Sequence, residues 1–197
     1  MKLLEERIIK DGQIRFSEKG DPIIKVGSFL NHQIDVNLLL ELGEEVKRRF
    51  EGKQITKIVT VEASGIAIAT AFAVVLKVPV VFAKKHATLN VDPERCLTAR
   101  IHSYTHDTDY TISIERDCIK AEDKLLFVDD FLANGEALRG LYTIAESAGA
   151  DVTGCAIAIE KGFQKGGDNL RREGKQIESL AIIDSIENGK IVFRENN

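Results

Sequence analysis

The feature that most constrains the fold of this chain is a repeated alternation of continuous apolar runs with segments of helical spacing. Between residues 57 and 86, KIVTVEASG breaks at Ser64-Gly65, IAIATAFAVVLK has the composition of a buried helix, and VPVVFAKK resumes the apolar pattern. Apolar runs without polar alternation are typical of parallel strands that are covered on both faces. The stretch therefore predicts a βαβ unit.

The same pattern returns in the second half of the chain. KLLFVDDFLANG predicts a strand, EALRGLYTIAESAGA a helix that ends near Gly149, and VTGCAIAIEK a wholly apolar strand. We expect an α/β protein with a doubly wound parallel sheet, whose ligand crevice lies beyond the carboxyl ends of the strands. Four loops fall at such ends: EASG, FAKKH, DDFLANGEA and IEKGF.

Other segments predict elements at the margins of this sheet. Helical spacing at residues 3–10 and 36–50 predicts two helices. Residues 98–115 alternate apolar and polar side chains, which indicates two half-exposed strands of a hairpin or a long loop. Asn188-Gly189 between two apolar runs predicts a tight hairpin.

Composition indicates one soluble domain without a nucleic-acid or membrane partner. The 197 residues are 44% hydrophobic and 29% charged, and the net charge of −4 gives no field that would attract a polyanion. The longest apolar stretch, IAIATAFAVVL, is too short to span a bilayer. Three cysteines without CxxC spacing argue against a disulfide framework and a zinc site, and four histidines show no metal-ligand spacing. These features predict a cytoplasmic protein without a metal site of its own.

The stretch LFVDDFLANGEA, residues 126–137, carries the clearest chemical signal. The backbone N–H groups of the ANGEA turn and of a following helix start would bind a phosphate, and Gly135 lets the anion approach the backbone. Asp129 and Asp130 would repel that phosphate unless a sugar diol lies between, because ionised carboxylates accept hydrogen bonds from hydroxyls. The loop therefore predicts a phosphate and ribose site. The alternative is a helix cap with a spare acid.

LFVDDFLANGEA resembles the phosphoribosyl pyrophosphate signature of the type I phosphoribosyltransferases. VGSFLNHQID, TKIVTVEASGIA, VPVVFAKKH, SYT and AIEKGF extend the resemblance, in order and spacing, to the xanthine-using members of bacterial purine salvage. The resemblance implies the type I phosphoribosyltransferase fold, with a core of about residues 36–175 and a small hood from about 1–35 and 176–197 of one domain, 1–197. It also implies a homodimer, and Mg²⁺ bound with the pyrophosphate through substrate oxygens and water.

The implied reaction moves 5-phosphoribose from phosphoribosyl pyrophosphate to N9 of xanthine, giving xanthosine 5′-monophosphate and pyrophosphate. Asp129 and Asp130 would be the catalytic pair, which hold the ribose diol and stabilise positive charge at the anomeric carbon. The residues that would bind the two phosphate ends are Ala133, Asn134, Gly135, Glu136 and Ala137 for the 5-phosphate, and Ala63, Ser64, Gly65 and Lys85 for the pyrophosphate.

The implied base pocket consists of Ile24, Asn31, Lys161 and Phe131. A lysine can donate to a 6-oxo group but cannot accept from an exocyclic amine, so Lys161 favours oxopurines over adenine. Asn31 could supply the donor that the second carbonyl of xanthine requires, although an asparagine in a loop is also a common turn residue. Phe131 would pack on the face of the base.

The segment from FAKKH to SYT resembles the mobile loop that closes over the reacting bond in this family and keeps water out. Its Lys84, Lys85, Arg100 and His102 either contact pyrophosphate or are solvated loop residues. Hypoxanthine-guanine members carry a further acid in the phosphate turn, where this chain has Ala133. Either another group near N7 handles the purine proton, or the base enters as an anion.

Two alternatives compete with this enzyme. One is a non-catalytic regulator of the same fold that senses phosphoribosyl pyrophosphate and binds nucleic acid, and the other is an enzyme that prefers guanine or hypoxanthine. A regulator of this kind usually carries a DNA-binding domain or a basic face, whereas this chain is acidic. The enzyme is therefore the preferred interpretation.

Overall fold

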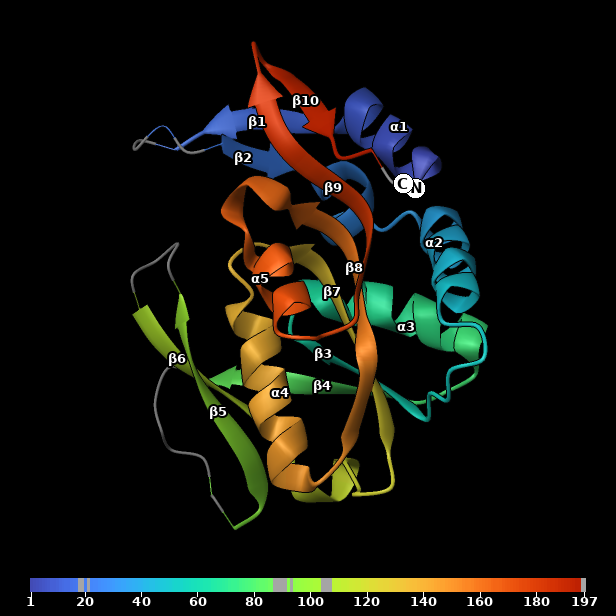
Figure 1. Ribbon diagram of the computed structural model, residues 1–197, viewed down its shortest axis with the longest axis vertical. Coiled ribbons are helices and arrows are strands. Elements are labelled where there is room, and N and C mark those ends of the chain that lie inside the picture. The colour runs from blue at the N-terminus through green and yellow to red at the C-terminus, as the bar shows by residue number, and fades with distance from the viewer. Residues whose placement is uncertain (18–19, 21, 87–91, 93, 104–107, 196–197) are drawn as a thin grey trace.

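The sheet follows the predicted alternation. A computed structural model describes residues 1–17, 20, 22–86, 92, 94–103 and 108–195. Within these residues an eight-stranded sheet has the order β10-β9-β8-β7-β3-β4-β6-β5 (Figure 1). Its strands are β3 (Lys57–Val61), β4 (Val80–His86), β5 (Cys96–Ser103), β6 (Thr108–Glu115), β7 (Lys124–Leu132), β8 (Asp151–Lys161), β9 (Ile177–Glu187) and β10 (Lys190–Phe193).

The five central strands are parallel and both edges are antiparallel. Parallel ladders join β9, β8, β7, β3 and β4, so the predicted parallel core and βαβ unit are confirmed. β5 and β6 form an antiparallel hairpin beside β4, which selects the hairpin over the long loop for residues 98–115. β10 pairs with β9 across Asn188-Gly189, as that dipeptide predicted. The sheet is therefore mixed, because β10 at one edge and β6 and β5 at the other extend the parallel core with antiparallel strands.

Helices cover both faces of the sheet. They are α1 (Lys2–Asp11), α2 (Val36–Arg49), α3 (Ser64–Leu76), α4 (Glu136–Ala148) and α5 (Gly166–Arg172), with a π-helical turn η1 (Gly27–Asn31) and 3₁₀ turns η2 (Arg116–Cys118) and η3 (Gly162–Gln164). α2 begins after Asp35, whose carboxylate accepts a hydrogen bond from the N–H of Leu38 at 3.1 Å. α4 ends at Gly149 (φ 71°), a left-handed cap that glycine adopts without strain. The helices expected at 3–10 and 36–50 are confirmed.

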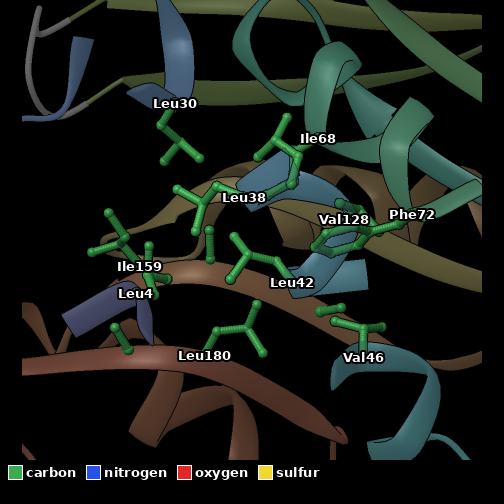
Figure 2. Packing of buried hydrophobic residues seen from close by; sticks show 14 of the residues in the cluster. Leu4, Leu30, Leu38, Leu42, Val46, Ile68, Phe72, Val128, Ile159 and Leu180 are labelled. Atoms are coloured by element: carbon green, nitrogen blue, oxygen red, sulfur yellow. The ribbon is translucent and has the colours of Figure 1, made fainter. Parts of the chain in front are cut away.

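The strand β7 divides its side chains between two hydrophobic clusters. Leu126 and Val128 point into the cluster of α1, α2 and α3, and Leu125 and Phe127 into the cluster of α4 and the β5–β6 hairpin. Figure 2 shows Phe72 packed near Val128 in the first cluster. Burial on both faces explains why β7 reads as a continuous apolar run.

The amino-terminal region contains a hairpin that the sequence patterns did not predict. β1 (Gln13–Phe16) and β2 (Pro22–Lys25) pair antiparallel as a separate two-stranded sheet. They lie with α1 and β10 at one end of the molecule (Figure 1). The α-amino group of Met1 donates to the carbonyl of Leu180 on β9, which joins this end to the main sheet.

Two further sequence predictions concern cysteines and membranes. Cys96, Cys118 and Cys155 are free, as the spacing of the cysteines predicted. Within the described part of the chain, no helix is long and apolar enough to cross a membrane.

Candidate active site

The two acids of the signature lie on β7 itself. The sequence pattern placed them at the end of an apolar run, whereas the strand continues through Asp129 and Asp130 to Leu132. The residues 133–137, here called the phosphate turn, follow, and α4 starts at Glu136 after Gly135 (φ 92°). Because β3, β7 and β8 are parallel neighbours, the loops after them meet at one edge of the sheet.

Asp130 joins three segments that are distant in the sequence. Its carboxylate accepts a hydrogen bond from Ser64 Oγ at the start of α3 (3.0 Å) and from Asn31 Nδ2 at the end of η1 (3.1 Å). The residue is 6% exposed. Two hydrogen bonds to its charged oxygens therefore hold this nearly buried carboxylate in one orientation.

The surroundings of Asp129 disfavour its ionised form. One of its carboxylate oxygens accepts a hydrogen bond from the N–H of Asp130 at 3.0 Å. Burial, followed by the negative charge of Asp130, raises the pKa of Asp129 well above its usual range, and Lys85 opposes the shift. A hydroxyl donor placed at this carboxylate would favour its ionised form, so a bound diol would lower the pKa of Asp129 again.

The loop after β3 approaches the acids closely. A Cβ on Gly65 would lie 2.0 Å from Thr60 Oγ1 and 3.3 Å from an Asp129 carboxylate oxygen, so only glycine fits there. The peptide between Glu62 and Ala63 is cis. The Glu62 carboxylate accepts a hydrogen bond from the backbone N–H of Lys85 at 2.6 Å, which attaches the end of β4 to this loop.

A pocket opens above the phosphate turn. It is lined by His102, Tyr110, Asp129, Phe131, Leu132, Ala133, Asn134, Gly135, Glu136, Ala137 and Leu138. All five predicted 5-phosphate residues therefore line one pocket together with Asp129. The amino end of α4 points its first N–H groups into this region, and such ends favour anions.

Contacts from α5 support the phosphate turn from behind. The N–H of Gly166 donates to the carbonyl of Ala133 at 3.1 Å. Behind α5, Glu160 is 1% exposed and accepts two hydrogen bonds from Arg171, at 2.9 and 2.7 Å, and one from Ser179 at 2.5 Å. The turn is thus backed by a buried, fully paired charge.

The predicted base-binding residues come from four elements, namely β2 (Ile24), η1 (Asn31), β7 (Phe131) and β8 (Lys161). Lys161 ends β8, and its ammonium lies 5.4 Å from the centroid of the Phe131 ring. Burial lowers the pKa of Lys161, and Asp130 opposes the shift. Ile24 is 5% exposed within the first hydrophobic cluster, and Asn31 bonds to Asp130. Asn31 and Lys161 are thus linked to Asp130, whereas Phe131 also lines the pocket of the phosphate turn.

The four candidates for pyrophosphate binding separate in the structure. Lys85 lies near Asp129, and His102 lines the pocket while bonding Asp109 at 2.7 Å. Lys84 lines a different hollow, and Arg100 pairs with Asp109 at 2.5 Å. The SYT motif lies mostly outside the described residues, which include the backbone of its serine only.

Two features of the site escaped the sequence patterns. Tyr110 lines the pocket, yet it lies in the polar, alternating segment read only as a half-exposed strand. The pairing of Glu160 with Arg171 gave no signal either, since partners 11 residues apart share no motif. The one available indication of this ion pair was Glu160 itself, which directly follows the apolar residues AIAI, because a buried charge requires a partner.

Comparisons with known proteins give a consistent result. Xanthine phosphoribosyltransferase of Clostridium novyi is 50% identical over 194 residues, which cover 98% of this chain and 100% of that protein. The enzyme of the same name from Latilactobacillus sakei is 48% identical, over 100% of this chain and 98% of that protein. Adenine phosphoribosyltransferase of Thermoanaerobacter pseudethanolicus has a similar fold, with a TM-score of 0.74, 24% identity and coverage of 91% and 98%. No protein-family model matches the chain.

Proposed function

This chain belongs to the xanthine phosphoribosyltransferase family, and from that premise we propose how its site works. The reaction moves 5-phosphoribose from phosphoribosyl pyrophosphate to N9 of xanthine, with xanthosine 5′-monophosphate and pyrophosphate as products. The bond from C1 of the ribose to pyrophosphate breaks, the bond from C1 to N9 forms, and the purine loses a proton. The observation that carries the proposal is that Asp130, on the strand that leads into the phosphate turn, accepts hydrogen bonds from Ser64 after β3 and from Asn31.

Asp129 and Asp130 hold the ribose in this proposal. Their carboxylates accept hydrogen bonds from the two ring hydroxyls, while Ala133 to Ala137 donate backbone N–H groups to the 5-phosphate. The nearly buried charge of Asp130 stabilises positive charge that develops at C1 as pyrophosphate leaves. Ala63, Ser64, Gly65 and Lys85 bind the pyrophosphate end. The bond between Glu62 and the backbone of Lys85 supports this grouping.

Lys161, Phe131, Asn31 and Ile24 form the base pocket in this proposal. The Lys161 ammonium donates to the 6-oxo group, and the base packs on Phe131, which that ammonium already faces at 5.4 Å from the ring centroid. Asn31 donates to the second carbonyl of xanthine. Its Nδ2 carries two hydrogens, so the amide can keep its hydrogen bond to Asp130 while its second N–H donates to the base.

Mg²⁺ would be bound together with the sugar pyrophosphate. The donor set fits an ion carried by substrate oxygens and water, because the carboxylate of Asp130 already accepts two hydrogen bonds. Among the described residues, no group of three or more His, Cys, Asp or Glu side chains is arranged to hold a metal. When bound, the ion neutralises charge on the leaving pyrophosphate. Lys85 acts on the same charge from the protein side.

The assembly proposed for this enzyme is a cytoplasmic homodimer whose residues 1–35 and 176–197 form a hood beside the base. Exposed apolar side chains on α3 and β4, Val74 at 64% and Phe82 at 39%, support a protein partner on that side. Multi-angle light scattering on the purified protein tests the dimer. Phe82→Glu should reduce its mass to that of a monomer.

The deciding experiment measures pyrophosphate release from Mg-phosphoribosyl pyrophosphate with xanthine, guanine, hypoxanthine or adenine as acceptor. Turnover with xanthine well above the other bases is the expected result. Faster turnover with guanine or hypoxanthine would contradict the substrate. Binding of phosphoribosyl pyrophosphate without turnover of any base would support a sensor, which a nucleic-acid mobility shift at physiological salt would then test.

A further inference from the structure

A tyrosine outside the signature faces the phosphate pocket. Tyr110 lies on β6, in the hairpin that pairs with β4, and lines the pocket together with Asp129 and the phosphate turn. Its side chain is half-buried. A tyrosine in this position presents an apolar ring to the protein and a polar hydroxyl that can bind a ligand.

Lys85 connects Tyr110 to the loop after β3. The Lys85 ammonium lies 5.6 Å from the centroid of the Tyr110 ring, which is within cation–π range. The backbone N–H of the same lysine donates to Glu62. Tyr110 therefore shares a pocket with the phosphate turn and contacts the pyrophosphate-binding lysine, so it lies between the residues assigned to the two ends of phosphoribosyl pyrophosphate.

The charges around the phenol favour its protonated form. Burial raises the pKa of Tyr110, and the carboxylates of Asp129 and Glu136 raise it further. The hydroxyl is thus available as a hydrogen-bond donor at neutral pH. In a pocket that receives a phosphate, an anionic oxygen is the acceptor that gives the stronger, charge-assisted bond.

We propose that Tyr110 is a further phosphoribosyl pyrophosphate-binding residue, whose hydroxyl donates to an oxygen of the 5-phosphate while its ring positions the Lys85 ammonium for the pyrophosphate. This inference rests on the proposed function. It assigns substrate contact to the β5–β6 hairpin at a residue outside the SYT motif. The hydroxyl would bind the 5-phosphate end of the substrate, and the ring would act on the pyrophosphate end through Lys85. One substitution that removes only the hydroxyl and another that removes the ring can therefore separate the two roles.

Titration calorimetry with two partial ligands, ribose 5-phosphate and Mg-pyrophosphate, tests this division. Tyr110→Phe keeps the ring, and we expect about tenfold weaker binding of ribose 5-phosphate from the loss of a hydrogen bond to a charged group, with pyrophosphate binding unchanged. Tyr110→Leu removes the ring and should weaken both ligands. Tyr142→Phe is the matched control, because Tyr142 is also half-buried under a lysine, Lys175 at 4.3 Å from its ring centroid, but lies on α4 outside the pocket.

The outcomes distinguish this inference from the proposed function. Unchanged binding of ribose 5-phosphate by Tyr110→Phe, or equal weakening of both ligands, would overturn the role of the hydroxyl. If the unaltered protein binds no phosphoribosyl pyrophosphate, the proposed function fails and the Tyr110 assignment fails with it. If the unaltered protein converts xanthine while Tyr110→Phe binds ribose 5-phosphate normally, only the Tyr110 assignment fails. Thermal unfolding of each variant verifies that it is folded.

Discussion

The phosphate turn and the β5–β6 hairpin line the same pocket, yet they are held in different ways. The turn bonds to α5, and behind α5 the carboxylate of Glu160 is 1% exposed and paired twice with Arg171. On the hairpin, Arg100 pairs with Asp109, and their side chains are 71% and 40% exposed. Buried paired charges resist disruption strongly, whereas exposed pairs contribute little to stability. The charged pairs that support one wall of the pocket are therefore buried, whereas those on the other wall are exposed and weak.

Removal of Arg171 should have the largest effect. Arg171→Ala leaves Glu160 buried without its charged partner, and we expect a loss of about 3–5 kcal/mol in the free energy of unfolding. Urea denaturation measures this loss. The matched control is Arg139→Ala, which breaks a similar two-bond pair, with Glu173, at the surface. An equal loss in both variants would show that burial does not distinguish the two pairs.

A methyl group behind the phosphate turn should affect substrate binding next most strongly. A Cβ on Gly166 would lie 2.1 Å from the carbonyl oxygen of Ala133. Because that oxygen belongs to the backbone of the phosphate turn, the clash can be relieved only if α5 or the turn moves. We expect Gly166→Ala to cost about 1–3 kcal/mol of stability and to raise KM for phosphoribosyl pyrophosphate about tenfold. Steady-state kinetics at saturating xanthine test this. A KM that stays at the wild-type value would mean that the turn does not depend on α5.

Asp129→Asn should separate stability from activity. Because the folded state raises the pKa of Asp129, the folded protein keeps a proton that the unfolded chain releases, so this carboxyl lowers stability as pH rises from the ordinary value of 3.8 toward the raised one. The asparagine variant does not titrate and should be more stable than wild type at pH 7. Its turnover should fall about 100-fold, because a bound ribose diol favours the ionised carboxylate, and the amide can neither carry that charge nor accept hydrogen bonds on both of its atoms.

Denaturation midpoints at pH 4 and pH 7 test the sign of this effect. Asp123→Asn is the control, because burial alone raises the pKa of Asp123 but hydrogen bonds from Lys57, Lys120 and Thr56 outweigh it and lower the pKa. That variant should lose stability at pH 7, and less of it at low pH. A loss of stability at pH 7 in Asp129→Asn would refute the electrostatic account of the acid pair.

The smallest effect is expected on the hairpin. Arg100→Gln removes an ion pair whose two side chains are largely exposed, so the denaturation midpoint should not change measurably. Raised salt should likewise leave the variant and the wild type indistinguishable. A shift comparable to that of Arg171→Ala would remove the contrast between the two walls.

Sequence patterns predicted those features that depend on local periodicity or on a contiguous motif. The parallel strands, the flanking helices and both edge hairpins followed from apolar spacing and from turn residues such as Asn188-Gly189. Side-chain partners could not be predicted, because Asn31 and Asp130 are 99 residues apart and meet only through the topology of the sheet. β1 and β2 were missed because their burial is slight, so their side chains show little apolar alternation.

The hydrogen bonds that join Ser64 and Asn31 to Asp130 also imply that catalytic activity returns late during refolding. Ser64 and Asn31 are 66 and 99 residues away from Asp130 along the chain, and closing such long loops costs entropy before any contact offsets it. During refolding, helical circular dichroism should return first, since α2, α3 and α4 are local structures. Transferase activity should return only when β3 has paired with β7, because that pairing brings the distant segments to one carboxylate.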